Sequence, residues 1–247
     1  MLDSYKQHVE ERKSQNIPPL PLDADQTSQL VELLKSEHAE AELLIHLLKE
    51  RIPAGVDQSA YVKAAFLSDI ASGDASSPYI SKKEAVEILG TMLGGYNIEP
   101  LIKCLQIDEL GEVASEALSK TLLIFDAFNE IYELSKTNNH AKNVINAWAE
   151  GKWFTDKPDI DEQIKLTVFK VTGEINTDDL SPATDAWSRP DIPLHALSMF
   201  KMPREGLDKP LETIEELKKK GNPLVFVGDV VGTGSSRKSA TNSVLWH

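Results

Sequence analysis

The spacing of apolar residues changes once along this chain, and the change divides the chain in two. Up to about residue 155, segment after segment repeats apolar residues at helical spacing. The stretch QIKLTVFKVTG at 163–173 instead alternates apolar and polar residues, as a half-buried strand does. Between the two patterns lies TDKPDIDEQ, rich in proline and aspartate. The sequence therefore predicts a helical domain over 1–156, a linker over 157–163 and an α/β domain over 164–247.

The predicted helices of the first part have recognisable start and stop signals. Two pairs of residues have the spacing of a capping box, in which side chain and backbone bond reciprocally at a helix start. The pairs are Asp23 with Gln26 and Ser81 with Glu84. Gly73, Gly94 and Gly95 are predicted to end helices in the left-handed conformation. Helix pairs of roughly 35 to 45 residues without an exact repeat predict a loose α-solenoid. A plain helical bundle is the alternative, because spacing alone does not distinguish the two.

Composition disfavours several classes of protein, among them nucleic-acid binders, disulfide-bonded proteins and membrane proteins. The chain of 247 residues has a formal net charge of −13, which disfavours bulk binding to nucleic acids and anionic membranes. Its one cysteine, Cys104, lies in an apolar run and is predicted to be a buried core residue. A single thiol makes no internal disulfide and holds no zinc or iron–sulfur centre by itself. Without a signal segment or a run long enough to span a bilayer, the chain is predicted to be a soluble cytoplasmic protein.

The α/β part contains one long segment without a clear helix or strand pattern. EINTDDLSPATDAWSRPDIPLHAL, residues 174–197, is predicted to be a loop, and loops of this length in compact domains are usually functional. PLETIEELKKKGN follows as an amphipathic helix with a glycine stop, and PLVFVGD is predicted to be a buried strand. The order of elements defines an α/β domain.

The segment GTGSSRKS, residues 232–239, has the form of a glycine-rich loop between a strand and a helix. It is not a phosphate loop of the Walker type, because Arg237 occupies the place of the second glycine. It also lacks the third glycine of a dinucleotide-binding loop. A helix start still presents amide groups and a positive dipole end to an anion. In the alternative interpretation, Ser236 caps the helix and the two cations are solvated.

Side chains of this loop and of the segment 174–197 predict the kind of anion. Arg237 can bind a carboxylate with two hydrogen bonds, Lys238 adds a second cation, and two serines add hydroxyl groups. The segment 174–197 contributes Asp178, Asp179 and Arg189. Aspartate before proline-rich turns is also ordinary loop chemistry. If the two loops converge, the predicted ligand is a small polycarboxylate.

Several of these motifs occur together in one known family. NTDDLSPA, AWSRPDIPLHA and VGDVVGTGSSRKSATNS, with the helical stretch GTMLGGYNIEPLI, closely resemble the aconitase B family of bacterial aconitate hydratases. The resemblance extends from MLDSYKQHVEER to NSVLW. It implies an all-α HEAT-like N-terminal domain followed by part of an α/β swivel domain, and therefore an N-terminal fragment of the enzyme.

The resemblance also implies roles for individual residues at matching positions. Ser235 matches the catalytic base of the family. The positions that match or adjoin binders of the substrate's carboxylates are Arg189, Ser236, Arg237 and Lys238. Asp178 matches an aspartate that lines the site. Asp179 stands where many other aconitases have histidine, so no role is carried over to it.

The implied reaction is the isomerisation of citrate and isocitrate through cis-aconitate, and the family also dehydrates 2-methylisocitrate. The implied cofactor is a [4Fe–4S] cluster whose ligand cysteines are not in this chain, so no metal ligand is expected here and the chain alone is predicted to be inactive. As partners, the resemblance implies a homodimer formed through the helical domain and messenger-RNA binding by the cluster-free form, with no membrane partner.

Overall fold

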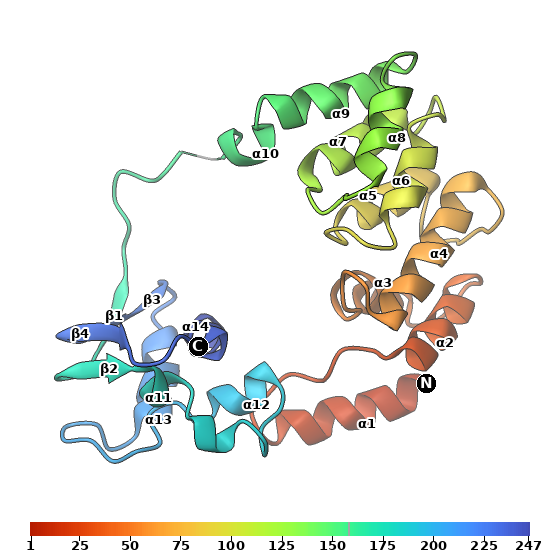
Figure 1. Ribbon diagram of the computed structural model, residues 1–247. Helices are drawn as coiled ribbons and strands as arrows, with labels where there is room; N and C mark the ends of the chain where they lie inside the picture. Colours follow the sequence, from red (N-terminus) through yellow and green to blue (C-terminus); the bar gives the residue numbers. More distant parts are fainter. Residues whose placement is uncertain (158) are drawn as a thin grey trace. The chain divides into compact units, whose positions relative to one another are not determined.

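The computed structural model describes residues 1–157 and 159–247, so Pro158, in the predicted linker, lies outside the described residues. The chain forms two compact units, each of which is described by itself. Unit 1 comprises Met1–His8 and Pro19–Pro158, and unit 2 comprises Val9–Pro18 and Asp159–His247. Figure 1 shows that the first is built from helices and the second from strands and helices.

The helices up to residue 155 follow one another with short connections. They are α1 (Leu2–Lys13), α2 (Ala24–Leu34), α3 (Ala41–Glu50), α4 (Gln58–Ser72), α5 (Lys82–Gly90), α6 (Ile98–Cys104), α7 (Gly111–Lys120), α8 (Ala127–Leu134), α9 (Asn139–Ala149) and α10 (Lys152–Thr155). Helices near each other in the sequence pack together: α2 with α4, α4 with α5, α5 with α7 and α7 with α9. This nearest-neighbour packing is typical of an α-solenoid.

Both predicted capping boxes are confirmed. The Asp23 carboxylate accepts a hydrogen bond from the Gln26 amide at 2.7 Å, and the Gln26 side chain accepts one from the Asp23 amide at 3.1 Å. Ser81 and Glu84 are bonded in the same reciprocal way. Gly73 ends α4 with φ +93°, as predicted.

The predicted end of α5 is wrong. The helix stops at Gly90, where the Thr91 hydroxyl donates to the Ile88 carbonyl at 2.7 Å. Gly94 and Gly95 are left-handed, with φ +113° and +87°, but they lie in the turn before α6. A Cβ on Gly94 would lie 2.9 Å from the carbonyl oxygen of Leu123. The close approach of these two backbone segments therefore requires a glycine at position 94.

The core of unit 1 is formed by leucine, isoleucine and alanine side chains on the facing sides of these helices. Cys104 belongs to it, as predicted, with an exposed fraction of 3%. Burial raises the pKa of its thiol to about 11, so the thiolate form is disfavoured. No helix among the described residues has the length and apolarity needed to cross a membrane.

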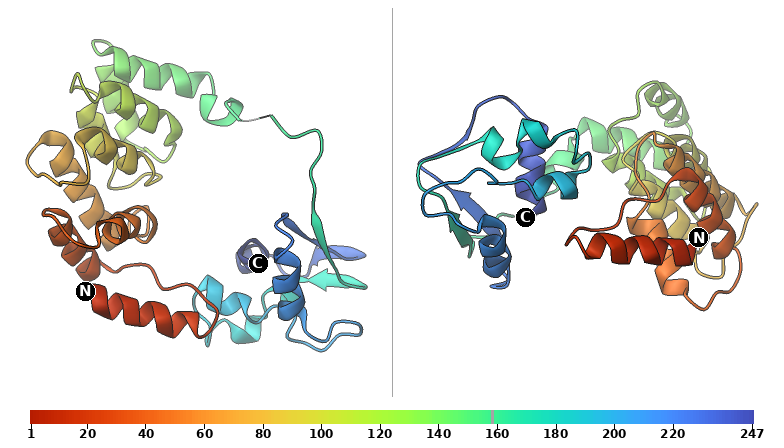
Figure 2. Two further views of the ribbon diagram at one scale, coloured as in Figure 1. Left: turned by 180° about the vertical axis from the view of Figure 1, so that it is seen from behind. Right: turned by 90° about the horizontal axis from the view of Figure 1, so that it is seen from below.

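In the described range 159–247, unit 2 has two pairs of parallel strands and four α-helices. The strands are β1 (Thr167–Lys170), β2 (Glu174–Asn176), β3 (Leu224–Val227) and β4 (Val230–Thr233). β1 pairs with β3, and β2 with β4. The helices are α11 (Thr177–Leu180), α12 (Ile192–Ala196), α13 (Pro210–Lys218) and α14 (Lys238–Trp246), with a 3₁₀ turn at Ala183–Asp185. Figures 1 and 2 show α13 beside the strands, in agreement with its packing on β1.

The apolar side chains of β1 explain the position of the core. Its residues alternate between buried and exposed, as predicted. Phe169 is buried, and its ring centroid lies 5.6 Å from that of Phe200 and 5.4 Å from that of Phe226. Ile214 of α13 is fully buried in the same cluster. The prediction of a buried strand over 223–229 is wrong, because the side chains of β3 are half-buried or exposed. Among the described strands, β3 pairs with β1 alone.

The prediction of a loop without helix or strand over 174–197 is also wrong. The segment contains β2, α11, the 3₁₀ turn and α12. Asn176 caps α11 and Asp191 caps α12, where its carboxylate accepts a hydrogen bond from the Leu194 amide at 2.8 Å. Side-chain capping therefore makes these two short helical turns possible in a proline-rich sequence.

Candidate anion-binding site

Two glycines, one in β4 and one directly after it, shape the backbone that leads to α14. Gly232 and Gly234 have φ +87° and +94°, a region that other residues enter at a cost. A Cβ on Gly234 would lie 2.8 Å from the hydroxyl oxygen of Thr177, so the loop lies directly on the start of α11. The strand, glycine loop and helix occur in the predicted order.

The start of α14 has no side-chain cap. Arg237 occupies the N-cap position with extended backbone, and no side chain bonds there to an amide of the first turn. The interpretation in which Ser236 caps the helix is therefore wrong. Ser235, Ser236 and Lys238 are exposed, so the hydroxyl groups and the cation are accessible to a ligand.

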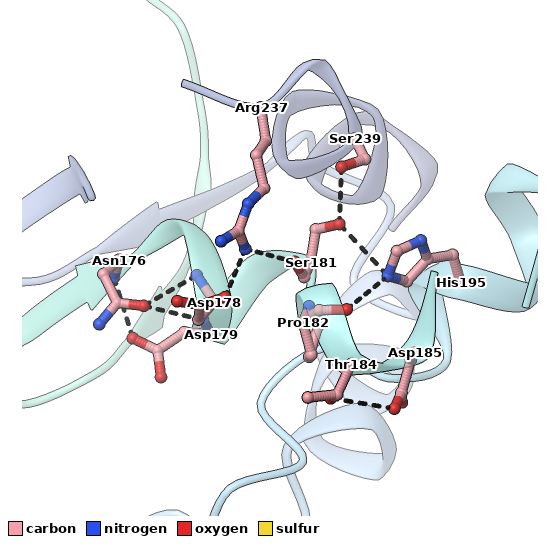
Figure 3. Close-up of polar contacts among 10 residues, drawn as sticks. All are labelled: Asn176, Asp178, Asp179, Ser181, Pro182, Thr184, Asp185, His195, Arg237 and Ser239. Carbon is pink, nitrogen blue, oxygen red and sulfur yellow. Dashed lines mark hydrogen bonds and ion pairs between the residues drawn. The ribbon is translucent and has the colours of Figure 1, made fainter. Parts of the chain in front are cut away.

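The structure pairs two of the predicted site residues. Arg237 Nη1 donates to the Asp178 carboxylate and, at 3.0 Å, to the carbonyl oxygen of Ser181 (Figure 3). The hydrogen bond from Arg237 lowers the pKa of Asp178 below its usual value. Among residues 1–157 and 159–247, no group accepts a hydrogen bond from Nε or Nη2 of Arg237. One edge of the guanidinium is thus anchored, and donors remain for a carboxylate.

Asp178 is held in place by the turn of α11. The Asn176 side-chain oxygen accepts from the amides of Asp178 and Asp179 at 2.9 and 3.0 Å. The Asp179 carboxylate accepts from the Asn176 amide at 2.9 Å and from Arg204 Nη2, also at 2.9 Å (Figure 3 shows the Asn176 part). Asp179, to which the resemblance gave no role, therefore closes a capping box and fixes the conformation of its neighbour Asp178.

Arg189 makes its hydrogen bonds elsewhere in unit 2. Its Nη1 donates to the Leu194 carbonyl at 3.0 Å, and its Nε lies 3.9 Å from the Asp185 carboxylate. A hydrogen bond from Lys201 lowers the pKa of Asp185 to about 2. Within the described chain, no hydrogen bond or ion pair joins Arg189 to residues 235–238. The predicted convergence of Arg189 with the glycine loop stays a prediction.

A second arginine contacts the same region of unit 2. Arg12, in the segment Val9–Pro18, donates to both carboxylate oxygens of Asp191 at 3.0 and 3.1 Å. Burial raises the pKa of Asp191, but the hydrogen bonds from Arg12 and the Leu194 amide outweigh it, and the pKa is lowered. Asp191 therefore remains ionised as the N-cap of α12.

Four residues of the site region were missed by sequence reasoning: Asn176, Ser181, His195 and Ser239. Asn176 had a readable signal, because Asn176 and Asp179 have the spacing of a capping box. The other three had none. Ser181 is fully buried and donates to the Ser239 hydroxyl at 2.8 Å, while His195 lies against both Ser181 and Pro182 (Figure 3).

The residues of this chain do not fit an iron–sulfur cluster. Such a cluster is held by several thiolates, and the sequence has one cysteine, which is buried in unit 1. No group of three or more His, Cys, Asp and Glu residues in the described part of the chain is arranged to hold a metal ion.

Fold and site together define a class: a stacked helical unit followed in sequence by a small parallel α/β unit with an arginine-bearing glycine loop. Comparison with known families is consistent with this division. The family model described as Aconitate B N-terminal domain matches residues 4–154, and that of Aconitate hydratase 2 N-terminus matches residues 166–247. The chain belongs to the aconitase B family.

Its relatives agree with this assignment. Aconitate hydratase B of Pseudomonas aeruginosa is 58% identical to the chain, that of Synechocystis sp. 59% and that of Escherichia coli 56%. In each case the match covers 100% of this chain but only 29%, 28% and 30% of the relative. The chain thus spans less than a third of the length of these relatives.

Proposed function

We propose that this chain is the N-terminal part of an aconitate hydratase B, a hydro-lyase that isomerises citrate and isocitrate through cis-aconitate. The observation that carries the proposal is the hydrogen bonding of Arg237. Its Nη1 donates to Asp178 and Ser181, while the N–H groups of Nε and Nη2 remain available to a ligand. A guanidinium held in this way is suited to a carboxylate, and the substrates are polycarboxylates.

The roles follow from the chemistry of the loop. Ser235 acts as the base that removes a proton from the carbon next to a carboxylate, and Arg237 with the start of α14 stabilises its alkoxide. Ser236, Lys238 and Arg189 bind the other carboxylate groups. A substrate held only through its carboxylates can be released and bound again in the reversed orientation, as the isomerisation requires.

The remaining machinery lies outside these residues. A [4Fe–4S] cluster would take its thiolates from another part of the polypeptide and would supply a Lewis acid for the departing hydroxyl group. The loops described here supply carboxylate binding and a base, and the chain alone is expected to be inactive. Turnover of cis-aconitate by the isolated chain would contradict this.

A chimera tests the proposal. The 247 residues replace the matching N-terminal region of the P. aeruginosa relative, and cis-aconitate hydration is measured after cluster reconstitution. The chimera is expected to be active, and Ser235→Ala and Arg189→Lys to abolish turnover without changing the oligomeric state. Lys220→Ala, which removes an exposed cation after α13, is the control and is expected to leave the rate unchanged. Full activity of Ser235→Ala would refute the assigned role.

A specific observation favours a second function for unit 1, assembly with another copy of the chain. The segment from α7 to α8 exposes several large apolar side chains. They are Leu122, Leu123, Phe125, Phe128 and Tyr132. We infer that they contribute to a homodimer, and Phe125→Ser is expected to shift sedimentation of the chain towards the monomer.

The messenger-RNA role stays a prediction from the resemblance, which the net charge of −13 does not support. Such binding should weaken steeply with salt.

A further inference from the structure

Three polar side chains outside the predicted site connect the elements that bear it. Ser181 follows α11, which bears Asp178. His195 belongs to α12, and Ser239 lies in the first turn of α14, directly after Arg237 and Lys238. Figure 3 shows the three next to one another, beside Arg237.

The direction of the hydrogen bonds in this cluster can be worked out. The Pro182 carbonyl oxygen accepts only, and it lies 3.1 Å from His195 Nε2, so Nε2 carries a hydrogen. The same N–H lies 3.4 Å from the Ser181 hydroxyl oxygen, which accepts from it. The Ser181 hydroxyl hydrogen is then directed to Ser239, 2.8 Å away. Each hydrogen bond of the chain His195–Ser181–Ser239 therefore has a defined donor and acceptor.

Ser181 contacts the start of α14 at two points. Its carbonyl oxygen accepts from Arg237 Nη1 at 3.0 Å, and its hydroxyl bonds Ser239. With an exposed fraction of 0%, Ser181 has no water to replace a lost partner. Displacement of Ser181 would move both the arginine and the turn that follows it.

We propose that Ser181, His195 and Ser239 are positioning residues that hold Arg237 at the angle at which it binds a substrate carboxylate. The cluster acts through Arg237 and contacts no substrate itself. This inference rests on the proposed function for its effect on catalysis, but the positioning of Arg237 can be measured independently.

The first experiment uses the chain itself and needs no activity. Because Arg237 lowers the pKa of Asp178, that pKa reports how well the arginine is placed. Carbon-13 NMR titration of the Asp178 carboxyl is expected to give a higher pKa in Ser239→Ala and His195→Leu than in the unchanged chain. Ser243→Ala is the control, a buried serine of the same helix with no hydrogen bond to Ser181 or His195 among the described residues. An unchanged Asp178 pKa in both cluster variants would overturn the inference.

The second experiment measures catalysis in the chimera. Removal of one neutral hydrogen bond from the cluster is expected to raise KM for citrate about five- to tenfold while kcat falls less. His195→Gln keeps an N–H at the position of Nε2 and is expected to restore KM, whereas His195→Leu is not. If the cluster only stabilises the fold, the variants will unfold at a lower temperature, but their folded fraction will have the KM of the parent chimera. An inactive parent chimera would count against the proposed function, and the titration would still decide the inference.

Discussion

Replacement of the half-buried Asp179 should destabilise unit 2. Its carboxylate is 11% exposed and accepts hydrogen bonds from the Asn176 amide and from Arg204, both at 2.9 Å. Asp179→Ala removes both bonds and leaves the amide and part of the guanidinium unpaired. The variant Asp179→Asn keeps an oxygen for the amide and loses only the charge.

The magnitudes follow from the bonds lost. A hydrogen bond to a charged group contributes about 1.5–3 kcal/mol, and loss of a helix cap costs about 1 kcal/mol. Because Arg204 is 24% exposed, water partly replaces its contact. We therefore expect Asp179→Ala to lower the free energy of unfolding by about 2–3 kcal/mol, and Asp179→Asn and Arg204→Ala by about 1 kcal/mol each.

Hydrogen exchange read by mass spectrometry, over a series of urea concentrations, separates the two units. Peptides from β1 and β3 should report the loss in unit 2, while peptides from α5 and α7 should be unchanged. If Asp179→Ala changes the exchange of β1 by less than about 0.5 kcal/mol, the capping box is not a stabilising feature and Asp178 is held by other contacts.

Four further predictions concern single side chains. Gly234→Ala should cost about 1–2 kcal/mol in urea unfolding, because φ is +94° and a Cβ would meet Thr177. Cys104 should react with a thiol reagent at pH 8 only in denaturant, because its pKa is about 11; rapid native labelling would contradict its burial. Burial lowers the pKa of Lys63 to about 8, so the free energy of unfolding should rise between pH 8 and 10.5, where the folded chain has lost the proton and the unfolded chain still holds it. Lys63→Met should raise Tm at pH 7 and abolish this pH dependence. Asp185 has a pKa of about 2, so its stabilising effect should be present above pH 4 and disappear as pH falls to 2. The resulting decrease in Tm should be seen in the unchanged chain and be absent in Lys201→Ala.

Features set by neighbouring residues could be predicted from the sequence. Such features are the capping boxes at Asp23 and Ser81, the alternation in β1 and the left-handed Gly221 after α13, all of which depend on contacts within a few residues. The predicted end of α5 lies too far along the chain, because Gly94 and Gly95 are required by contacts with distant backbone, which no local pattern reveals. The prediction of a loop over 174–197 fails because proline-rich sequence rarely forms helices, whereas capping by Asn176 and Asp191 stabilises two short helical turns here.

The candidate site was only partly predictable. The sequence predicts Asp178 and Arg237 in two separate loops, but the ion pair between them joins residues 59 positions apart and depends on the packing of α11 against α14. The cluster of Ser181, His195 and Ser239 has no spacing that marks it, because each residue belongs to a different element. Arg189 has the right chemistry for a carboxylate, and its part in the site stays a prediction.

The most direct test of the proposed function is the rate of cis-aconitate hydration by the chimera with and without Arg237→Lys. Lysine keeps the charge but offers no planar pair of donors, so the account predicts a rise in KM of at least about tenfold with the fold intact. An Arg237→Lys chimera with unchanged KM and kcat would show that the guanidinium does not bind the substrate.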